Sequence, residues 1–358
     1  MSPATTLTPR ERMQLALDHQ EADQIPIHDA PWAATVSRWR KEGMPDAVTP
    51  TEYFGFHLCG FGADLTPQYP IRVLERNDEY IIESTAYGGV RKNHRDYSTT
   101  PELLDYGVKS REDWEAAKRR LQPGFTRVDW VSLKNNYSRA KSDNLFLTFS
   151  AITGYDLCQA YIRSDMLLPL LIDAPDWVQD MVETQADMVI EMAKIVMAEG
   201  YGFDAAFLYN DMGYKNGPFF SPRMYRKIIK PADKRMFDFF HARGMKVILH
   251  SCGDVRMLLP DLIEAGLDCI QPLEVKAGMD VVALKQQYGQ DLAFMGGIDV
   301  RAMADPDPAA IEQEIAAKIP AAKAGGGYIY HSDHSIPNNV SFEQYCRVLD
   351  LVKKYGAY

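Results

Sequence analysis

The sequence predicts an α/β protein folded as a (β/α)8 barrel, and three observations lead to that prediction. Short apolar runs of strand type alternate with amphipathic helical runs through the second half of the chain. The connections between them are short, which is typical of parallel strands joined by right-handed helical crossovers. With the earlier strands there are seven or eight such units, enough to close a barrel. A doubly wound open sheet is the alternative, but no glycine-rich fingerprint follows the first predicted strand.

Seven segments have the composition of buried strands, because each is short, apolar and bounded by turn-forming residues. They are residues 24–28, 145–149, 205–209, 246–250, 268–272, 292–295 and 327–331. Helical patterns fill the later intervals and cover about 222–243, 258–263, 281–288, 307–319 and 341–355. Two capping boxes, Thr8 with Glu11 and Ser341 with Gln344, mark the starts of the first and last helices.

Residues 51–140 interrupt this alternation. Residues 73–90 alternate polar and apolar side chains around Gly88 and Gly89, which predicts a hairpin or meander. Residues 108–120 are highly charged and predict a solvated helix. We therefore expect one domain over residues 1–358, with an insertion at about 51–140 that covers one end of the barrel.

Composition and charge exclude several classes of protein. Of the 358 residues, 46% are hydrophobic and 25% are charged, which excludes an intrinsically disordered chain. The 39 basic and 49 acidic residues leave a net charge of −10, which argues against non-specific binding to nucleic acid or anionic membranes. No apolar run reaches the ~18 residues of a membrane span, and residues 1–6 lack a secretory pattern. The five scattered cysteines fit a reducing compartment, so we expect a cytoplasmic protein.

Polar residues follow five of the predicted strands at the point where each strand ends. In a barrel of this kind the carboxyl ends of the strands form the working face. This rule selects Asn210, Asp211, His250, Cys252, Gln271, Glu274, Asp299, His331, Asp333 and His334.

His250 and Cys252 lie two residues apart just after a strand, so both side chains can turn toward one centre. One imidazole, one thiolate and a third ligand from another strand make a zinc site with an open fourth position. We expect His334 as the third ligand, with His331 as its substitute. The carboxylate that would orient the ligand imidazoles is Asp333, Asp299 or Glu274. The alternative is that His250 and Cys252 are ordinary structural residues.

Several motifs are spread over nearly the whole chain. They are Leu-Thr-Pro-Arg-Glu-Arg at 7–12, Asp-Met-Gly at 211–213, His-Ser-Cys-Gly at 250–253, Pro-Asp-Leu-Ile-Glu-Ala-Gly at 260–266, Gly-Gly-Ile-Asp at 296–299 and Ile-Pro at 336–337. In these motifs the chain resembles the uroporphyrinogen decarboxylase superfamily, and within it the branch of cobamide-dependent methyltransferases. The resemblance implies a (β/α)8 barrel, in agreement with the alternation of strands and helices.

Two reactions occur in that superfamily, and the sequence bears on both. The true decarboxylases need no cofactor and resemble one another in an N-terminal arginine-rich segment that holds porphyrin carboxylates. Here residues 27–32 read Ile-His-Asp-Ala-Pro-Trp, and the next arginine is Arg38. This departure argues against a tetrapyrrole substrate, and cofactor-free decarboxylation stays as the alternative.

The methyltransferase branch carries a zinc site of the form His-x-Cys with a distant cysteine. His250 and Cys252 match the first two ligands, whereas His334 stands where the distant cysteine is expected, before Ile336. The site would then hold one sulfur and two nitrogens, and zinc with one negative charge fewer is a stronger Lewis acid. Decarboxylases also carry a histidine near this position, so His334 does not discriminate between the two reactions.

The resemblance implies transfer of a methyl group between a small methoxy, thiol or amine compound and a corrinoid. No Asp-x-His-x-x-Gly signature is present, so the corrinoid would be carried by a partner protein. We expect Asp211 and Glu274 to act in catalysis, by holding polar groups or passing a proton. The residues expected to bind substrate are Asn210, Gln271, Asp299 and His331. A homodimer is compatible with the sequence, and a non-catalytic corrinoid-binding protein is a third reading.

Overall fold

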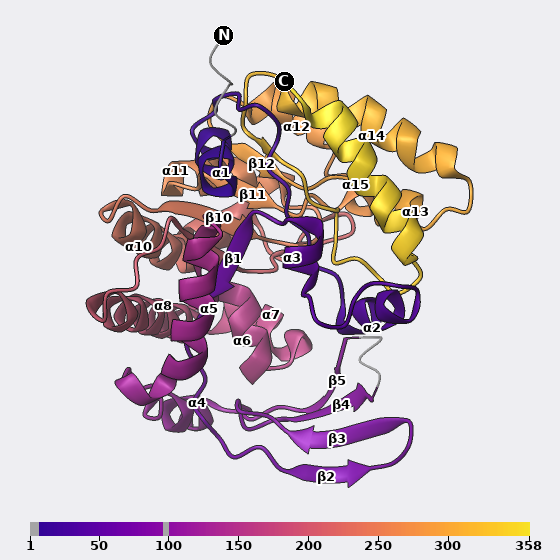
Figure 1. The fold of residues 1–358 in the computed structure, drawn as a ribbon. Helices are drawn as coiled ribbons and strands as arrows, with labels where there is room; N and C mark the ends of the chain where they lie inside the picture. The colour runs from indigo at the N-terminus through magenta and orange to yellow at the C-terminus, as the bar shows by residue number, and fades with distance from the viewer. Residues whose placement is uncertain (1–6, 96–99) are drawn as a thin grey trace.

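A curled parallel sheet forms the centre of the protein (Figure 1). In the computed structural model, which describes residues 7–95 and 100–358, seven strands pair in the order β1-β6-β7-β10-β11-β12-β13. Their bounds are β1 (Leu58–Phe61), β6 (Phe146–Ile152), β7 (Ala205–Tyr209), β10 (Lys246–His250), β11 (Cys269–Gln271), β12 (Ala293–Met295) and β13 (Tyr328–Ile329). The predicted parallel α/β architecture is confirmed. Residues 1–6, on which the expectation about a secretory signal rests, lie outside the described residues.

A short extended segment bridges the two edges of the sheet. The backbone N–H of Tyr330 donates to the carbonyl of Pro26 at 2.9 Å, and that of His28 donates to the carbonyl of Tyr330 at 3.1 Å. On the other side, the N–H of His57 donates to the carbonyl of Ile27 at 2.8 Å. The segment takes the place of the strand expected at 24–28, but only as isolated bridges. Pro26 has no N–H to give, which limits any regular ladder here.

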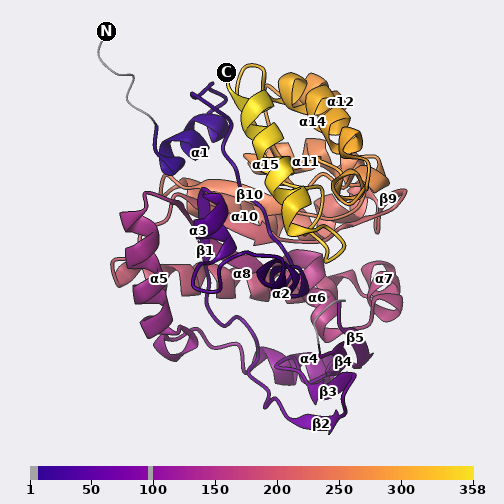
Figure 2. The same ribbon diagram turned by 45° about the vertical axis from the view of Figure 1, so that its right-hand side comes forward.

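Helices lie around the curled sheet (Figure 2). Met13 and Leu17 of the first helix share one buried cluster with Leu58, Phe146 and Ile248 of the sheet. Among the described residues no helix combines the length and apolar character needed to cross a bilayer. The helices are α1 (Pro9–Leu17), α2 (Ala33–Lys41), α3 (Pro50–Phe54), α4 (Arg111–Lys118), α5 (Trp130–Ser142), α6 (Gly154–Tyr161), α7 (Ser164–Asp173), α8 (Pro175–Ala198), α9 (Pro222–Met224), α10 (Lys230–His241), α11 (Leu259–Ala265), α12 (Val281–Tyr288), α13 (Val300–Met303), α14 (Pro308–Lys323) and α15 (Phe342–Gly356).

The interrupted region holds a separate antiparallel sheet of β2 (Val73–Arg76), β3 (Tyr80–Ser84), β4 (Val90–His94) and β5 (Glu102–Asp105). The turn predicted at Gly88 joins β3 to β4, and its φ of 83° favours glycine. The charged helix α4 differs from the expectation, because it buries Trp114 and Ala117 against the protein. Figure 1 shows this sheet projecting from one side of the molecule.

Two strands differ in how well the sequence predicts them. The strand predicted at 246–250 is β10 with the same bounds, and both capping boxes form as expected. Strand β1, however, lies within the range taken as an insertion and pairs in parallel with β6. Its four residues, Leu-Cys-Gly-Phe, are too few to show a period, and the glycine weakens the strand signal.

Candidate functional site

The candidate site lies where β7 and β10 end side by side. These strands pair in parallel, with His250 opposite Tyr209. One residue further, the N–H of Asn210 donates to the carbonyl of His250 at 2.9 Å. The loops that follow the two strands therefore leave the sheet together, and this brings Asp211 next to Cys252.

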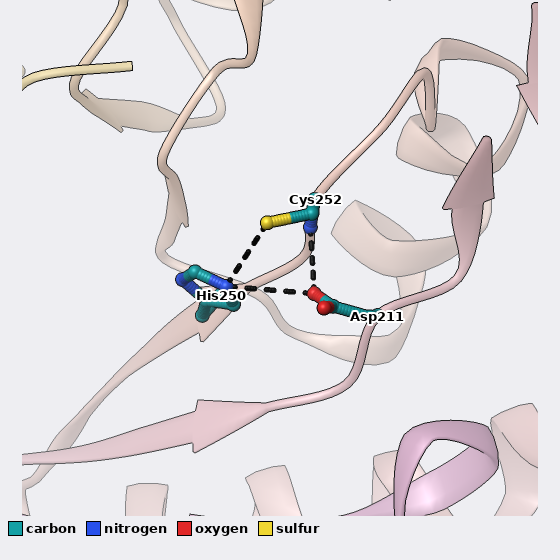
Figure 3. Close-up of side chains that lie close together, drawn as sticks. All are labelled: Asp211, His250 and Cys252. Carbon is teal, nitrogen blue, oxygen red and sulfur yellow. Dashed lines mark hydrogen bonds and ion pairs between the residues drawn. The ribbon is translucent and has the colours of Figure 1, made fainter. Parts of the chain in front are cut away.

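Three side chains converge at this point (Figure 3). The Nε2 atom of His250 lies 3.3 Å from Sγ of Cys252 and 3.4 Å from Oδ1 of Asp211. The same Oδ1 atom accepts a hydrogen bond of 2.7 Å from the backbone N–H of Cys252, which holds the carboxylate against the loop. One ligand atom from each residue falls within 4.8 Å of the other two. This is the separation expected of ligands that share one metal ion.

The far side of the imidazole is fixed by a chain of hydrogen bonds. Nδ1 of His250 lies 2.5 Å from Oε1 of Gln271, and Nε2 of Gln271 lies 3.3 Å from Nε2 of His331. Nδ1 of His331 in turn lies 2.7 Å from the carbonyl of Ser332. The Ser332 carbonyl can only accept, so Nδ1 of His331 carries a proton and its Nε2 accepts from the amide of Gln271. Oε1 of Gln271 then accepts from Nδ1 of His250, so His250 carries its proton on Nδ1. The lone pair of Nε2 is then left facing Asp211 and Cys252.

The electrostatics of the site disfavour a free thiolate and a charged imidazole. Burial raises the pKa of the Cys252 thiol, and the nearby carboxylates of Asp211 and Glu274 raise it further. Burial also lowers the pKa of His250, although Asp211 acts in the opposite direction. The protein alone therefore holds a thiol and a neutral imidazole. A bound cation would offset the negative charge of the carboxylates and favour loss of the Cys252 thiol proton, as thiolate ligation requires.

The donor set fits a zinc ion. Nitrogen, sulfur and a carboxylate oxygen are the three ligand types that zinc takes in proteins, and a soft thiolate disfavours magnesium or calcium. Three protein ligands are the number found at catalytic zinc, where a fourth position is left for water or substrate. Gln271 supplies the outer hydrogen bond that ligating histidines commonly make. The residues present therefore suit the metal that the sequence suggests.

The third member of the group differs from the expected one. His334 is not among the described residues whose ligand atoms gather at this point, and Asp211 takes its place. The ring of His334 instead packs edge-on against Trp32, with ring centroids 6.3 Å apart. Its effect on His250 is confined to a small lowering of the pKa of that imidazole. The substitute residue, His331, is also outside the group and supports it through Gln271.

The two loops touch through their glycines. Gly253 has a φ of 78°, and a Cβ placed there would lie 2.3 Å from the carbonyl carbon of Gly213. Conversely, a Cβ on Gly213 would lie 2.5 Å from the carbonyl oxygen of Cys252. Only glycine permits this approach, so the motif glycines next to Asp211 and Cys252 keep the two loops in contact.

The other predicted site residues have structural partners. Glu274 is buried, accepts the N–H of Gly253 at 2.7 Å and pairs with Lys276 at 3.0 Å. Asp299 caps helix α13 and forms an ion pair with Arg301, so it is engaged away from the centre.

Two further predicted residues are internal. Asn210 is fully buried, and its Oδ1 accepts the N–H of Asp156 at 3.2 Å. Asp333 is also buried and ties two loops together, because its carboxylate accepts the N–H groups of Val275 and Val300. The Asp333 carboxylate is engaged by these N–H groups, whereas the buried Nδ2 of Asn210 has no hydrogen-bond partner among the described residues.

Two residues near the site were missed by the sequence reasoning. Burial and the neighbouring Asp211 raise the pKa of Asp156 to about 7. Tyr209, the last residue of β7, packs its ring 5.1 Å from the ring of His250. The strand-end rule would have selected Tyr209, which ends β7, but not Asp156, which lies on helix α6.

Comparison with known proteins places the chain in a family. The model of uroporphyrinogen decarboxylase (URO-D) matches residues 159–355, more than half of the sequence. The chain belongs to the URO-D family. The match includes both loops of the candidate site, so Asp211, His250 and Cys252 all lie within the matched residues.

Methyltransferases are among the relatives of this URO-D protein. A methylated-thiol–coenzyme M methyltransferase from Methanosarcina mazei is 27% identical over 129 residues, which cover 35% of this chain and only 31% of that protein. The methylcobamide:CoM methyltransferase MtbA from Methanosarcina acetivorans is 24% identical over 295 residues, covering 78% and 80%. The solved structure of a methyltransferase from Methanosarcina mazei shares the fold, with a TM-score of 0.69 at 15% identity over 98% and 99% of the two chains.

Proposed function

We propose that the protein is a zinc-dependent methyltransferase, which moves a methyl group between a small substrate and a corrinoid carried by a partner protein. The observation that carries the proposal is the convergence of Asp211, His250 and Cys252 at the carboxyl end of a URO-D-family sheet. The relatives that act on methylcobamide and methylated thiols support the reaction class. The ligand set differs from the one expected from the sequence, because Asp211 replaces His334.

The residues around the centre have distinct tasks. Zinc held there would act as a Lewis acid on a substrate thiol, ether oxygen or amine. Gln271 orients the imidazole of His250, while Glu274 holds the loop at Gly253. The Asp156 carboxyl, with its pKa of about 7, is suited to accept or return a substrate proton near neutral pH.

The corrinoid is assigned to a separate chain, as the sequence suggests. The inserted region reaches the mouth of the barrel through Tyr87, which follows β3 and lines a pocket there with Tyr209. We assign to this region the covering of bound substrate, which would exclude water from the reacting groups. A docked corrinoid protein would approach the remaining open side of the mouth.

A cofactor-free decarboxylase is the second candidate, because the matching family model carries that name. The N-terminal segment argues against it. The carboxylate of Asp29 there accepts hydroxyl hydrogen bonds from Ser332, Tyr330 and Tyr345, so this stretch is used to join the sheet edge to helix α15. A non-catalytic corrinoid-binding protein is the third candidate.

Metal analysis joined to a methyl-transfer assay tests the proposal. The purified full chain should contain about one zinc per chain, and it should move methyl groups between methylcobalamin and a panel of thiols, amines and methoxy compounds. Cys252→Ala should lose both properties, whereas Cys346→Ala, on helix α15, should keep them. Consumption of uroporphyrinogen by the metal-free chain would favour the decarboxylase instead. A chain that neither binds zinc nor transfers methyl groups would refute the proposal.

A further inference from the structure

A cavity opens at the mouth of the barrel beside the candidate metal centre. It has a volume of about 270 Å³, smaller than the roughly 300–1,000 Å³ of pockets for drug-sized ligands. The lining comes from the loop after β1, the ends of β6 and β7, helix α6 and the inserted sheet. Its residues are Ala63, Asp64, Leu65, Thr66, Tyr87, Ser150, Ala151, Ile152, Leu157 and Tyr209. We call this cavity the mouth pocket.

Tyr209 joins the mouth pocket to the metal centre. It lines the pocket, and its ring centroid lies 5.1 Å from that of His250 and 5.0 Å from that of Phe207. Across the pocket, the ring of Tyr87 meets Tyr161 edge to face at 5.0 Å. Both aromatic walls are therefore held by packing before any ligand arrives. A molecule that reacts at the metal centre has this space for the part that does not react.

The charges around the mouth pocket are negative. Asp64 lines it, and no lysine or arginine does so among the described residues. Burial acts to raise the pKa of Asp64, but hydrogen bonds from Thr66 and Gln68 and the charge of Arg127 keep it below its ordinary value. Burial and the charges of Asp64 and Asp156 raise the pKa of the Tyr87 phenol to about 12. Asp64 is thus ionised at neutral pH, and its field reaches across the pocket.

The nearest guanidinium does not serve the pocket. Arg127 is buried behind Asp64, and it donates to the backbone carbonyls of Gln122, Thr66 and Arg120. Because its donors are used and it does not line the cavity, it offers no hydrogen bond to an anionic ligand. An anion entering the pocket would meet Asp64 with no cation to pair with.

We propose that the mouth pocket binds a small organic cation, the ammonium group of the substrate, against the rings of Tyr87 and Tyr209 and the carboxylate of Asp64. Aromatic faces and a carboxylate are the surroundings that favour alkylated ammonium groups in proteins. The assignment rests on the proposed function, since it takes the bound molecule to be the methyltransferase substrate. It narrows the substrate class from methoxy, thiol or amine compounds to those that carry a positive charge.

The metal centre is compatible with a cation next to it. A divalent ion held by one thiolate, one carboxylate and one neutral imidazole has its charge balanced by its own ligands. The ammonium group would then meet Asp64 with little repulsion from the metal. The same balance leaves nothing at the centre to attract an anionic substrate in place of a cationic one.

Binding of choline to the full chain tests this assignment, with 3,3-dimethyl-1-butanol as its neutral isostere and 2-methoxybenzoate as an anionic probe. Calorimetric titrations are carried out on the zinc-loaded and the metal-free protein. We expect choline to bind at least tenfold more tightly than its isostere, and the anion not to bind. Tyr87→Leu should weaken choline binding by about 2- to 30-fold, the range of a cation–π contact. Tyr214→Leu, which removes an exposed tyrosine on β8 (Gly213–Tyr214), should leave it unchanged.

The outcomes separate the two proposals. Equal binding of choline and its isostere, preferential binding of the anion, or an unchanged affinity in Tyr87→Leu overturns the assignment of the mouth pocket. Asp64→Asn, which keeps the size of the side chain, provides a second variant in case Tyr87→Leu does not fold, and it should lose most of the preference for choline over the isostere. Failure of the proposed function shows separately, as absence of zinc from the wild-type chain. Even in that case, the titrations of the metal-free protein measure the affinity of the mouth pocket for choline.

Discussion

The Nδ1 atom of His250 lies 2.5 Å from the Oε1 atom of Gln271, and this contact decides which imidazole nitrogen faces Asp211. Without it, the ring could turn or carry its proton on the other nitrogen. The amide of Gln271 donates in turn to His331, so two residues outside the group of candidate ligands set the orientation of His250. Outer hydrogen bonds of this kind typically contribute 10- to 100-fold to metal affinity.

Replacement of Gln271 should therefore weaken zinc binding. In Gln271→Leu the imidazole keeps its place but loses its acceptor, and we expect the zinc dissociation constant to rise by about 10- to 100-fold. Competition with a chromophoric chelator measures this change. Gln287→Leu, on helix α12, is the matched control and should bind zinc as the wild type does. Equal affinities in the two variants would show that Gln271 does not orient His250.

Gly253 should tolerate no side chain. Gly253→Ala combines a left-handed φ of 78° with a contact of 2.3 Å to Gly213, whereas Gly244→Ala has a similar φ of 71° and open space around it. We expect Gly244→Ala to cost about 1–2 kcal/mol of unfolding free energy, from backbone strain alone. Gly253→Ala should cost at least about 1 kcal/mol more and also reduce zinc binding. Urea denaturation measures the unfolding free energies of the two variants. Equal losses of unfolding free energy would mean that the two loops separate without cost.

The fold and half of the site follow from the sequence for physical reasons. Strand β10 and the pair His250 and Cys252 are readable because a buried strand has an apolar run with a sharp polar end. The third member of the group could not be chosen from local patterns, because the choice between Asp211 and His334 depends on which strand neighbours β10. Strand β7 is its direct neighbour, while β13 is separated from it by β11 and β12. The order of the strands in the parallel sheet favours Asp211.

Other features could not be read from the chain. The hydrogen bonds from His250 through Gln271 to His331 join the ends of β10 and β11 to the segment after β13. No local pattern records a contact between residues that lie 60 positions apart in the sequence. The mouth pocket likewise depends on Tyr87, in the inserted sheet, meeting Tyr209 at the end of β7. Both are products of how distant segments pack.

The buried carboxyl of Asp233 should make stability depend on pH. Burial raises its pKa from 3.8 to about 7, although the hydroxyl of Tyr225 donates to it at 2.9 Å and opposes the shift. Between these values the folded chain holds a proton that the unfolded chain has lost, so this group's contribution to stability falls as pH rises through the window. Asp233→Asn has no proton to lose.

We therefore expect the melting temperature of Asp233→Asn, relative to wild type, to rise by roughly 2 °C or more between pH 5 and pH 8. Scanning calorimetry at several pH values measures the difference. Asp238→Asn, an exposed position on the same helix α10, should show no such trend. A constant difference for Asp233→Asn would mean that this carboxyl is already ionised in the folded protein at pH 5.

Asp211 and His334 can be told apart as third ligand by replacing each one. Zinc at 100 times its dissociation constant stabilises a folded chain by about 2.7 kcal/mol, so a thermal shift reports its binding. His334→Ala should keep this shift, because its ring packs on Trp32 and not in the group. Asp211→Asn should lose it, since a neutral amide neither offsets the ion's charge nor replaces a carboxylate ligand. The opposite result would show that the loop after β13 moves to the metal, restoring the ligand set expected from the sequence.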